Sequence, residues 1–343
     1  MKRNIILHIG RHKSGTSSLQ KFLCDNEEFL TAKGFYYPKA LRRQIAHHPL
    51  AQYYDKNQSK HLTKEDLLEI EEFWAEIKQH KNIIISSEAF QNINPKKMKV
   101  DFKDFNIKVV VYVRDQVSYL LSSYAQAVKA RKVTLTLERY EATQFKNMNY
   151  LKFIKRWEKA FSSVELIIGS FSKQHLLGGD IRKDFLIRSD ICQVGELDNL
   201  DYAEGEKNIS IGGGLLEFKR LLNFTDFDRH IDFNKLYKVL QDLAKNNASY
   251  KLTKDIPEGL YNLFIKKYNS SNNDFSREYL KTSELRFHKP EMFRNQFQLN
   301  AKQLDAIFLD IGNEDPGMAA NLKKQKAYLY RAISSKRHWS DYL

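Results

Sequence analysis

Basic and hydroxyl side chains gather near residue 13 of this chain, in a short loop between an apolar run and an expected helix. The apolar run, residues 5–9, is rich in isoleucine and predicts a buried parallel strand. A helix is expected to begin near Gly15. A strand, a Gly-containing loop and a helix N-terminus can hold an anion, because the first amides of a helix are unpaired and its dipole is positive there. The loop residues that offer charge, hydroxyls or amides are Arg11, His12, Lys13, Ser14, Gly15, Thr16 and Ser17.

The order of residues in this loop indicates which kind of anion site it is. The loop reads G-R-H-K-S-G-T, so that Lys13 stands two residues before Gly15. In the loop of nucleotide triphosphatases the lysine follows the second glycine, and a hydroxyl residue beside it binds magnesium. The spacing therefore favours a phosphate-type site that needs no metal. The alternative is a basic turn that binds nothing.

A second pair of anion-binding residues follows the apolar run 107–113. Arg114 comes directly after this run, and Ser122 stands eight residues later, about two helical turns on. Arginine offers a fork that matches phosphate oxygens, and serine a short hydroxyl donor. The alternative is that Arg114 caps its own helix or pairs with Asp115.

Two residues are candidates for proton transfer. Glu88 follows the apolar run 82–86 and has three interpretations: a general base, a magnesium ligand or a helix cap. His48 suits proton transfer near neutral pH, with an exposed loop histidine as the alternative. No spacing typical of a metal site is present in the sequence.

Four short apolar runs must position these residues. They cover 5–9, Asn82–Ser86, Ile107–Val113 and Val164–Gly169, and helical stretches separate them. This pattern predicts a P-loop-like, three-layer α/β fold with a central parallel sheet flanked by helices. Ligands of such sheets bind beyond the carboxyl ends of the strands, where the candidate residues stand. Helices are expected at 15–31, 64–80, 115–131, 149–161, 214–223, 233–246, 256–269, 298–312 and 317–334. We expect one domain over 1–343, with an α/β core at 1–190 and a helical extension at 191–343 that shapes an acceptor site.

The charge composition indicates which kinds of binding partner suit the protein. The 343 residues carry 56 basic and 42 acidic side chains, a net charge of +14, which suits an anionic ligand, an anionic membrane face or nucleic acid. We expect no nucleic acid, because no stacking motif or recognition helix is evident. Two cysteines, no apolar run of about 20 residues and an early first strand predict a cytoplasmic protein.

The two phosphate motifs together resemble those of sulfotransferases that use 3'-phosphoadenylyl sulfate (PAPS), whose loop reads K-[ST]-G-T-[TS]. The segments SGTSSLQ, IIISSEAF and RDQVSYLLSSYAQ are similar in sequence to those of bacterial enzymes that sulfate lipopolysaccharide, capsule or nodulation-factor sugars. Gln116 stands where many members have proline, and Ser18 where a tryptophan is common.

The resemblance implies PAPS as co-substrate, with no metal. Lys13 would stabilise the bridging oxygen of PAPS, and Gly15, Thr16 and Ser17 would hold its 5'-phosphate. Arg114 and Ser122 would hold the 3'-phosphate, and Glu88 or His48 would accept the proton.

The resemblance also implies a carbohydrate or glycolipid acceptor. Contact with the inner membrane surface is a further option, through the basic C-terminal cluster of Lys323, Lys324, Lys326, Arg331, Lys336 and Arg337. The competing functions are a P-loop kinase or other nucleotide triphosphatase and a non-enzymatic polyanion-binding protein. The acceptor's identity and the oligomeric state are not predicted.

Overall fold

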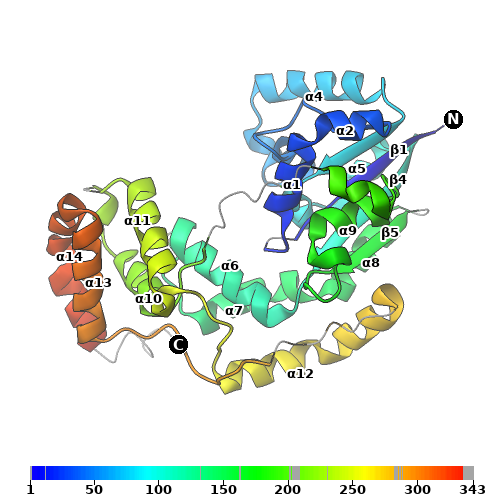
Figure 1. Cartoon of the computed structure of the whole chain (residues 1–343). Helices are drawn as coiled ribbons and strands as arrows, with labels where there is room; N and C mark the ends of the chain where they lie inside the picture. Colours follow the sequence, from blue (N-terminus) through cyan, green and yellow to red (C-terminus); the bar gives the residue numbers. More distant parts are fainter. Residues whose placement is uncertain are drawn as a thin grey trace. The chain divides into compact units, whose positions relative to one another are not determined.

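The computed structural model describes residues 2–11, 13–131, 133–161, 164–200, 202, 209–229, 231–281, 285, 287 and 289–334 (Figure 1). The chain forms two compact units. The first unit comprises Met1–Arg114, Asn149–Gly205 and Asn269–Arg286, and the second comprises Asp115–Met148, Glu206–Tyr268 and Phe287–Leu343. Neither unit is one continuous segment, so no single boundary near residue 190 divides them. Whether both units fold as one domain stays a prediction.

The first unit contains a five-stranded parallel sheet in the order β2-β3-β1-β4-β5. The strands are β1 (Arg3–His8), β2 (Phe35–Tyr36), β3 (Asn82–Ser86), β4 (Phe105–Val113) and β5 (Glu165–Ser170). The predicted parallel α/β fold with flanking helices is confirmed. The sequence pattern did not predict β2, because two residues are too short for a recognisable alternation.

Helices cover both faces of this sheet. Alternate residues of β1 point to opposite faces, so Ile5 and Leu7 belong to one buried cluster and Ile6 to the other. Beside the first cluster pack α3 (His48–Tyr54), α4 (Lys64–Ile77), α5 (Pro95–Asp101) and α8 (Tyr150–Ala160). Beside the second pack α1 (Thr16–Asp25), α2 (Glu27–Ala32) and α9 (Ile181–Arg188). The first unit therefore has three layers, with the sheet between two layers of helices.

Local capping sets the helix ends in this unit. The expected helix at 15–31 is divided at Asn26, whose backbone leaves the helical region and whose side-chain amide donates to the carbonyl of Phe22 at 2.9 Å. Thr63 and Asp66 form a capping box that starts α4. The helices α3, α5 and α9, like α7 of the second unit, lie outside the expected ranges; α3, α5 and α9 have eight residues or fewer.

The second unit is helical in its described parts. It contains α6 (Gln116–Arg131), α7 (Leu137–Met148), α10 (Gly213–Leu222), α11 (Phe233–Asn246), α13 (Ala301–Glu314) and α14 (Pro316–Ser334). Helix α12 (Glu258–Phe275) starts here, ends in the first unit and continues as a π-helical turn, Ser276–Leu280. The predicted helical C-terminal half is confirmed, and α6 and α7 group with it rather than with the sheet.

A buried ion pair stabilises the core of the second unit. Arg220 and Glu217, one turn apart on α10, are joined at 2.6 Å, and Nη1 of Arg220 donates to the carbonyl of Thr134 at 2.7 Å. Burial raises the pKa of Glu217, so the charge of its carboxylate depends on the arginine. None of the helices in the described parts of the chain is long and apolar enough to span a bilayer.

Removing one partner of this pair should cost more than removing both. We expect Arg220→Met to lower the free energy of unfolding by about 3–5 kcal/mol, because it leaves a buried carboxylate unpaired. The double variant Glu217→Leu/Arg220→Met should recover most of that loss in urea unfolding. Arg229→Met, at an exposed ion pair, is the control and should change stability by less than about 0.5 kcal/mol. A double variant as unstable as Arg220→Met contradicts this account.

Candidate functional site

The loop between β1 and α1 has the closed, left-handed turns of an anion-binding loop. The Ser14 amide and hydroxyl both donate to the carbonyl of Arg11, at 3.2 and 2.6 Å. Lys13 has a φ of 65° and Gly15 a φ of 77°. Since a residue other than glycine rarely adopts positive φ, the conformation of Lys13 must be held by its surroundings.

Arg114 supplies that restraint. It follows β4, which is paired with β1, and its Nη1 donates to the carbonyl oxygen of Lys13 at 2.8 Å. The two predicted phosphate elements therefore meet at the same edge of the sheet. One guanidinium nitrogen fixes the loop that carries Lys13.

Phe171 completes this contact, and sequence reasoning missed it. It follows β5 directly, and its ring lies 5.9 Å from the guanidinium carbon of Arg114. A Cβ on Gly15 would lie 2.5 Å from the same ring, so glycine is required there by space as well as by φ. The signal was available, because the residue after the fourth apolar run stands at the same sheet edge as Gly10, Glu88 and Arg114.

Helix α1 presents its N-terminus beside this loop. Gly15 is the N-cap and makes no side-chain cap, and the first turn holds no acidic residue. Thr16 is buried, whereas Ser17 is exposed. The first turn of α1 itself therefore contributes no carboxylate that would compete with an incoming anion.

Glu88 lies against the same loop. A Cβ on Gly10 would come within 3.0 Å of the Cα of Glu88, so these two backbones are in close contact. From α1, Nε2 of Gln20 donates to Oε2 of Glu88 at 3.0 Å. The carboxylate is thereby oriented next to the phosphate loop, as expected from its place after β3.

His48 joins Glu88, although the sequence treated them as alternatives. Nδ1 of His48 and Oγ of Ser87 lie 2.8 Å apart, and Nε2 of His48 lies 3.9 Å from Oε1 of Glu88. The side chains of His48 and Glu88 keep 38% and 16% of their surface exposed, so both remain accessible. The structure brings the two candidate bases together as a pair.

The histidines beside this pair are buried. Nδ1 of His8 lies 2.7 Å from Oγ of Ser86, and Nδ1 of His47 accepts the Ser86 amide at 3.2 Å. Burial lowers the pKa of both His8 and His47 to about 4. They are therefore neutral at physiological pH and serve to join β1, β3 and the start of α3.

Three predicted site residues lie elsewhere or are not described. Arg11 is 2% exposed, and its guanidinium lies 4.5 Å from the Phe153 ring, under α8. His12 falls outside the described residues. Ser122 lies on α6 in the second unit, so its pairing with Arg114 stays a prediction. Asp115, the predicted alternative partner of Arg114, accepts the amide of Ser118 at the start of α6.

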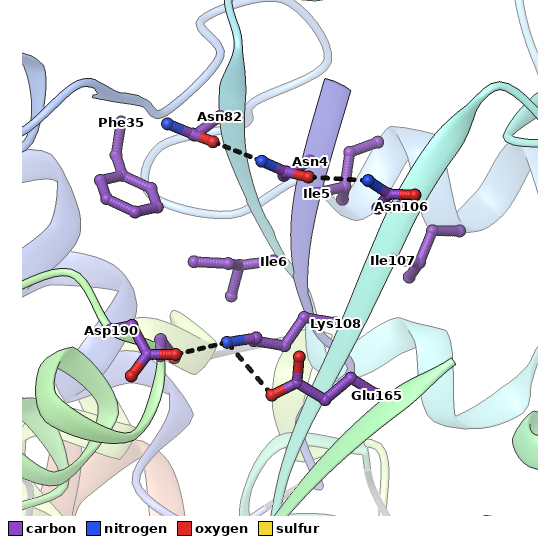
Figure 2. Close-up of a pocket in the computed structure, with 11 residues that line it drawn as sticks. Asn4, Ile5, Ile6, Phe35, Asn82, Asn106, Ile107, Lys108, Glu165 and Asp190 are labelled. Atoms are coloured by element: carbon purple, nitrogen blue, oxygen red, sulfur yellow. Dashed lines mark hydrogen bonds and ion pairs between the residues drawn. The ribbon is translucent and has the colours of Figure 1, made fainter. Parts of the chain in front are cut away.

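A polar cavity lies at the opposite, amino edge of the sheet. It has a volume of about 440 Å³. Figure 2 shows Asn82, Asn4 and Asn106 aligned across three strands, with hydrogen bonds of 2.8 and 3.1 Å between their side chains. Lys108 pairs with Glu165 and Asp190. Because these polar side chains form hydrogen bonds and ion pairs with one another, the cavity offers a ligand few free hydrogen-bond donors.

Metal ligands do not cluster in the part of the chain that the structure describes: no group of three or more His, Cys, Asp or Glu side chains there could hold an ion. Lys13, Arg114, the N-terminus of α1 and the Glu88–His48 pair lie at one edge of the sheet; their use as a phosphate site with a proton acceptor stays a prediction.

Comparison with known proteins adds little to this description. No family model matches the chain. An uncharacterised protein of Archaeoglobus fulgidus is 28% identical over 232 residues, which are 65% of this chain and 57% of that protein. The chain therefore spans little more than half the length of that relative.

Two solved structures show weak likeness. One is a sulfotransferase from Alicyclobacillus acidocaldarius, 15% identical, covering 65% of this chain and 92% of that one, with a TM-score of 0.38. The other belongs to the PezAT toxin–antitoxin system of Streptococcus pneumoniae, 14% identical, covering 57% and 85%, with a TM-score of 0.25. Both scores are too low to assign an activity.

The two buried histidines should make stability depend on pH. Their folded pKa of about 4 lies below the unfolded value of 6.5, so the unfolded chain binds more protons between these values. Stability should be full above pH 6.5 and fall toward pH 4, by about 1.4 kcal/mol per pH unit for each histidine. Urea unfolding from pH 7 to 4.5 measures this slope. His8→Gln should reduce it and the exposed control His61→Gln should not; equal slopes in all three proteins would refute the assignment.

Proposed function

We propose that this protein transfers the sulfuryl group of PAPS to a hydroxyl group of an acceptor. The observation that carries the proposal is the hydrogen bond from Arg114 to the Lys13 carbonyl, which joins the two predicted phosphate-binding elements beside a Glu–His pair. A phosphate loop alone would suit many nucleotides. Two features favour a donor with two separate phosphates: Lys13 stands before Gly15, and Arg114, at the end of β4, contacts the loop.

The groups at this edge fit such a donor. The α1 amides and the Thr16 and Ser17 hydroxyls are suited to its 5'-phosphate, and the Arg114 guanidinium to its 3'-phosphate. A share of Ser122 in holding the 3'-phosphate stays a prediction from the sequence motif. The ammonium of Lys13 would stabilise charge that develops on the bridging oxygen. This arrangement needs no magnesium, in contrast to a kinase.

The Glu88–His48 pair would receive the proton. As the acceptor oxygen forms its bond to sulfur, the bond from sulfur to the 5'-phosphate oxygen breaks and adenosine 3',5'-bisphosphate leaves. The hydroxyl proton passes to Glu88, and His48, held by Ser87, supports the carboxylate. Gln20 donates to the other carboxylate oxygen of Glu88 and thereby orients the carboxylate.

The acceptor and its setting follow from the resemblance of motifs. We take the acceptor to be a sugar hydroxyl of a surface glycan or glycolipid, modified in the cytoplasm or at the inner membrane face. The helical second unit is the natural place for acceptor contacts, because loops and helices outside the donor site vary most among such enzymes.

Donor binding can be tested without knowing the acceptor. Adenosine 3',5'-bisphosphate should raise the melting temperature, and ATP with or without magnesium should do so much less. In calorimetry, Arg114→Ala and Arg114→Lys should each weaken bisphosphate binding at least tenfold, since lysine lacks the fork. Lys21→Ala, at an exposed ion pair of α1, is the control and should bind normally. Preference for ATP with magnesium would favour the kinase alternative and overturn the proposal.

Turnover should depend on the base and on Lys13. With labelled PAPS and surface glycans of the source organism, Glu88→Gln should lower the rate about 10²–10⁴-fold while bisphosphate affinity is kept. Lys13→Ala should leave less than a tenth of the rate, and exposed Glu28→Gln should leave all of it. A large loss in His48→Gln with near-normal Glu88→Gln would instead make His48 the base.

A further inference from the structure

A second cavity, of about 410 Å³, lies at the amino edge of the sheet beside α5. Its apolar lining includes Phe102, Phe105 and Phe161, together with Ile107 and Val164. Phe102 packs against Trp74 with ring centroids 5.0 Å apart and against Phe105 at 5.9 Å. The apolar wall is therefore fixed by its neighbours and does not collapse into the space.

The charged residues that line this cavity are all basic, while the exposed acids Asp101 and Asp104 stand next to them in the sequence. Lys2, Lys99 and Lys103 line it, and none of the described lining residues is acidic. Among the described ion pairs, none involves these three lysines. Asp101 of α5 accepts a hydrogen bond from Tyr54 at 2.7 Å. Exposed Lys96 and Lys97 on the same helix add to the positive field.

An apolar side chain stands among these lysines on the outside of the protein. Val100, which also lines the cavity, is 68% exposed, although it is flanked by Lys99 and lies close in sequence to Lys103. Basic residues around an exposed apolar one, next to an apolar cavity, match a ligand that has an acidic headgroup and an apolar chain.

Nucleic acid matches this surface less well. Bases bind to basic proteins by stacking on exposed aromatic faces. Phe102 and Phe161 are 1% and 8% exposed, so their rings form the wall of a cavity and present no stacking face. The apolar chain of a lipid can pack against the phenylalanine-lined wall, whereas the polar edges of a base would meet mostly apolar side chains there apart from Asn106 and the lysines.

We propose that the α5 surface, defined by Lys2, Lys99, Val100 and Lys103, docks on an anionic lipid bilayer. The lysines contact the acidic headgroups, and Val100 and the phenylalanine-lined cavity take up apolar chain. This surface is separate from the phosphate loop, which lies at the other end of β1, about 20 Å along the strand. The basic residues Lys323, Lys324, Lys326 and Arg331 of α14 are not required. Lys336 and Arg337 of the C-terminal cluster lie outside the described residues.

Vesicle sedimentation tests the proposal on the full chain. Vesicles of phosphatidylcholine with one third phosphatidylglycerol should bind the protein, and pure phosphatidylcholine vesicles should not. Lys99→Gln/Lys103→Gln should weaken binding about tenfold or more at about 0.1 M salt. Val100→Ser should weaken it severalfold with no change in charge. These side chains are exposed, and urea unfolding verifies that each variant is folded.

A matched pair on α14 supplies the control. Lys323→Gln/Lys324→Gln removes the same charge from exposed positions and should leave binding within twofold. Equal losses in the two double variants, or an unaffected Val100→Ser, would mean attraction by net charge alone and overturn the proposal. So would binding of single-stranded RNA, but not vesicles, that depends on Lys99 and Lys103. No donor or acceptor of sulfuryl transfer is used, so failure here leaves the proposed function untouched.

Discussion

The parallel pairing of β1 on both of its sides is the constraint on which the site depends. Because β3 and β4 run alongside β1 in one direction, their last residues reach the same edge of the sheet. Gly10, Glu88 and Arg114 then meet around one loop. The hydrogen bond from Arg114 to the Lys13 carbonyl holds a lysine in a left-handed conformation that the loop alone would not favour. The conformation of the loop thus depends on the pairing of β4 with β1, which brings Arg114 to Lys13.

Near the carboxyl edge of the sheet, two histidine–serine contacts differ in their surroundings. Ser86, still in β3, faces the interior and binds His8, whereas the next residue, Ser87, contacts accessible His48. Alternation along an extended chain is the cause, since successive side chains point to opposite sides. The buried histidines, whose pKa is lowered by burial, join β1, β3 and the start of α3, whereas His48 lies beside Glu88 and stays accessible.

The two edges of the sheet differ in chemistry. The carboxyl edge gathers Lys13, Arg114 and the N-terminus of α1 beside the acid Glu88, whereas the cavity in Figure 2 has amides and ion pairs that satisfy one another. Beside that cavity the α5 surface is again unbalanced, with lysines and an exposed valine around an apolar space. We propose anions of different shape for the two places: a nucleotide phosphate at the loop, and lipid headgroups at α5.

The sequence by itself determined the parallel strands, the loop between the first strand and its helix, and the strand-end positions of Glu88 and Arg114. These are local features, written in apolar runs and in glycine and lysine spacing. Only the tertiary structure decided that Glu88 and His48 form a pair, that Phe171 supports Gly15 and Arg114, and that Arg11 lies beneath α8. It also grouped α6 and α7 with the C-terminal helices. These contacts join residues far apart in the sequence, from His48 and Glu88 to Gly15 and Phe171. They depend on the packing of whole layers, and no local pattern records them.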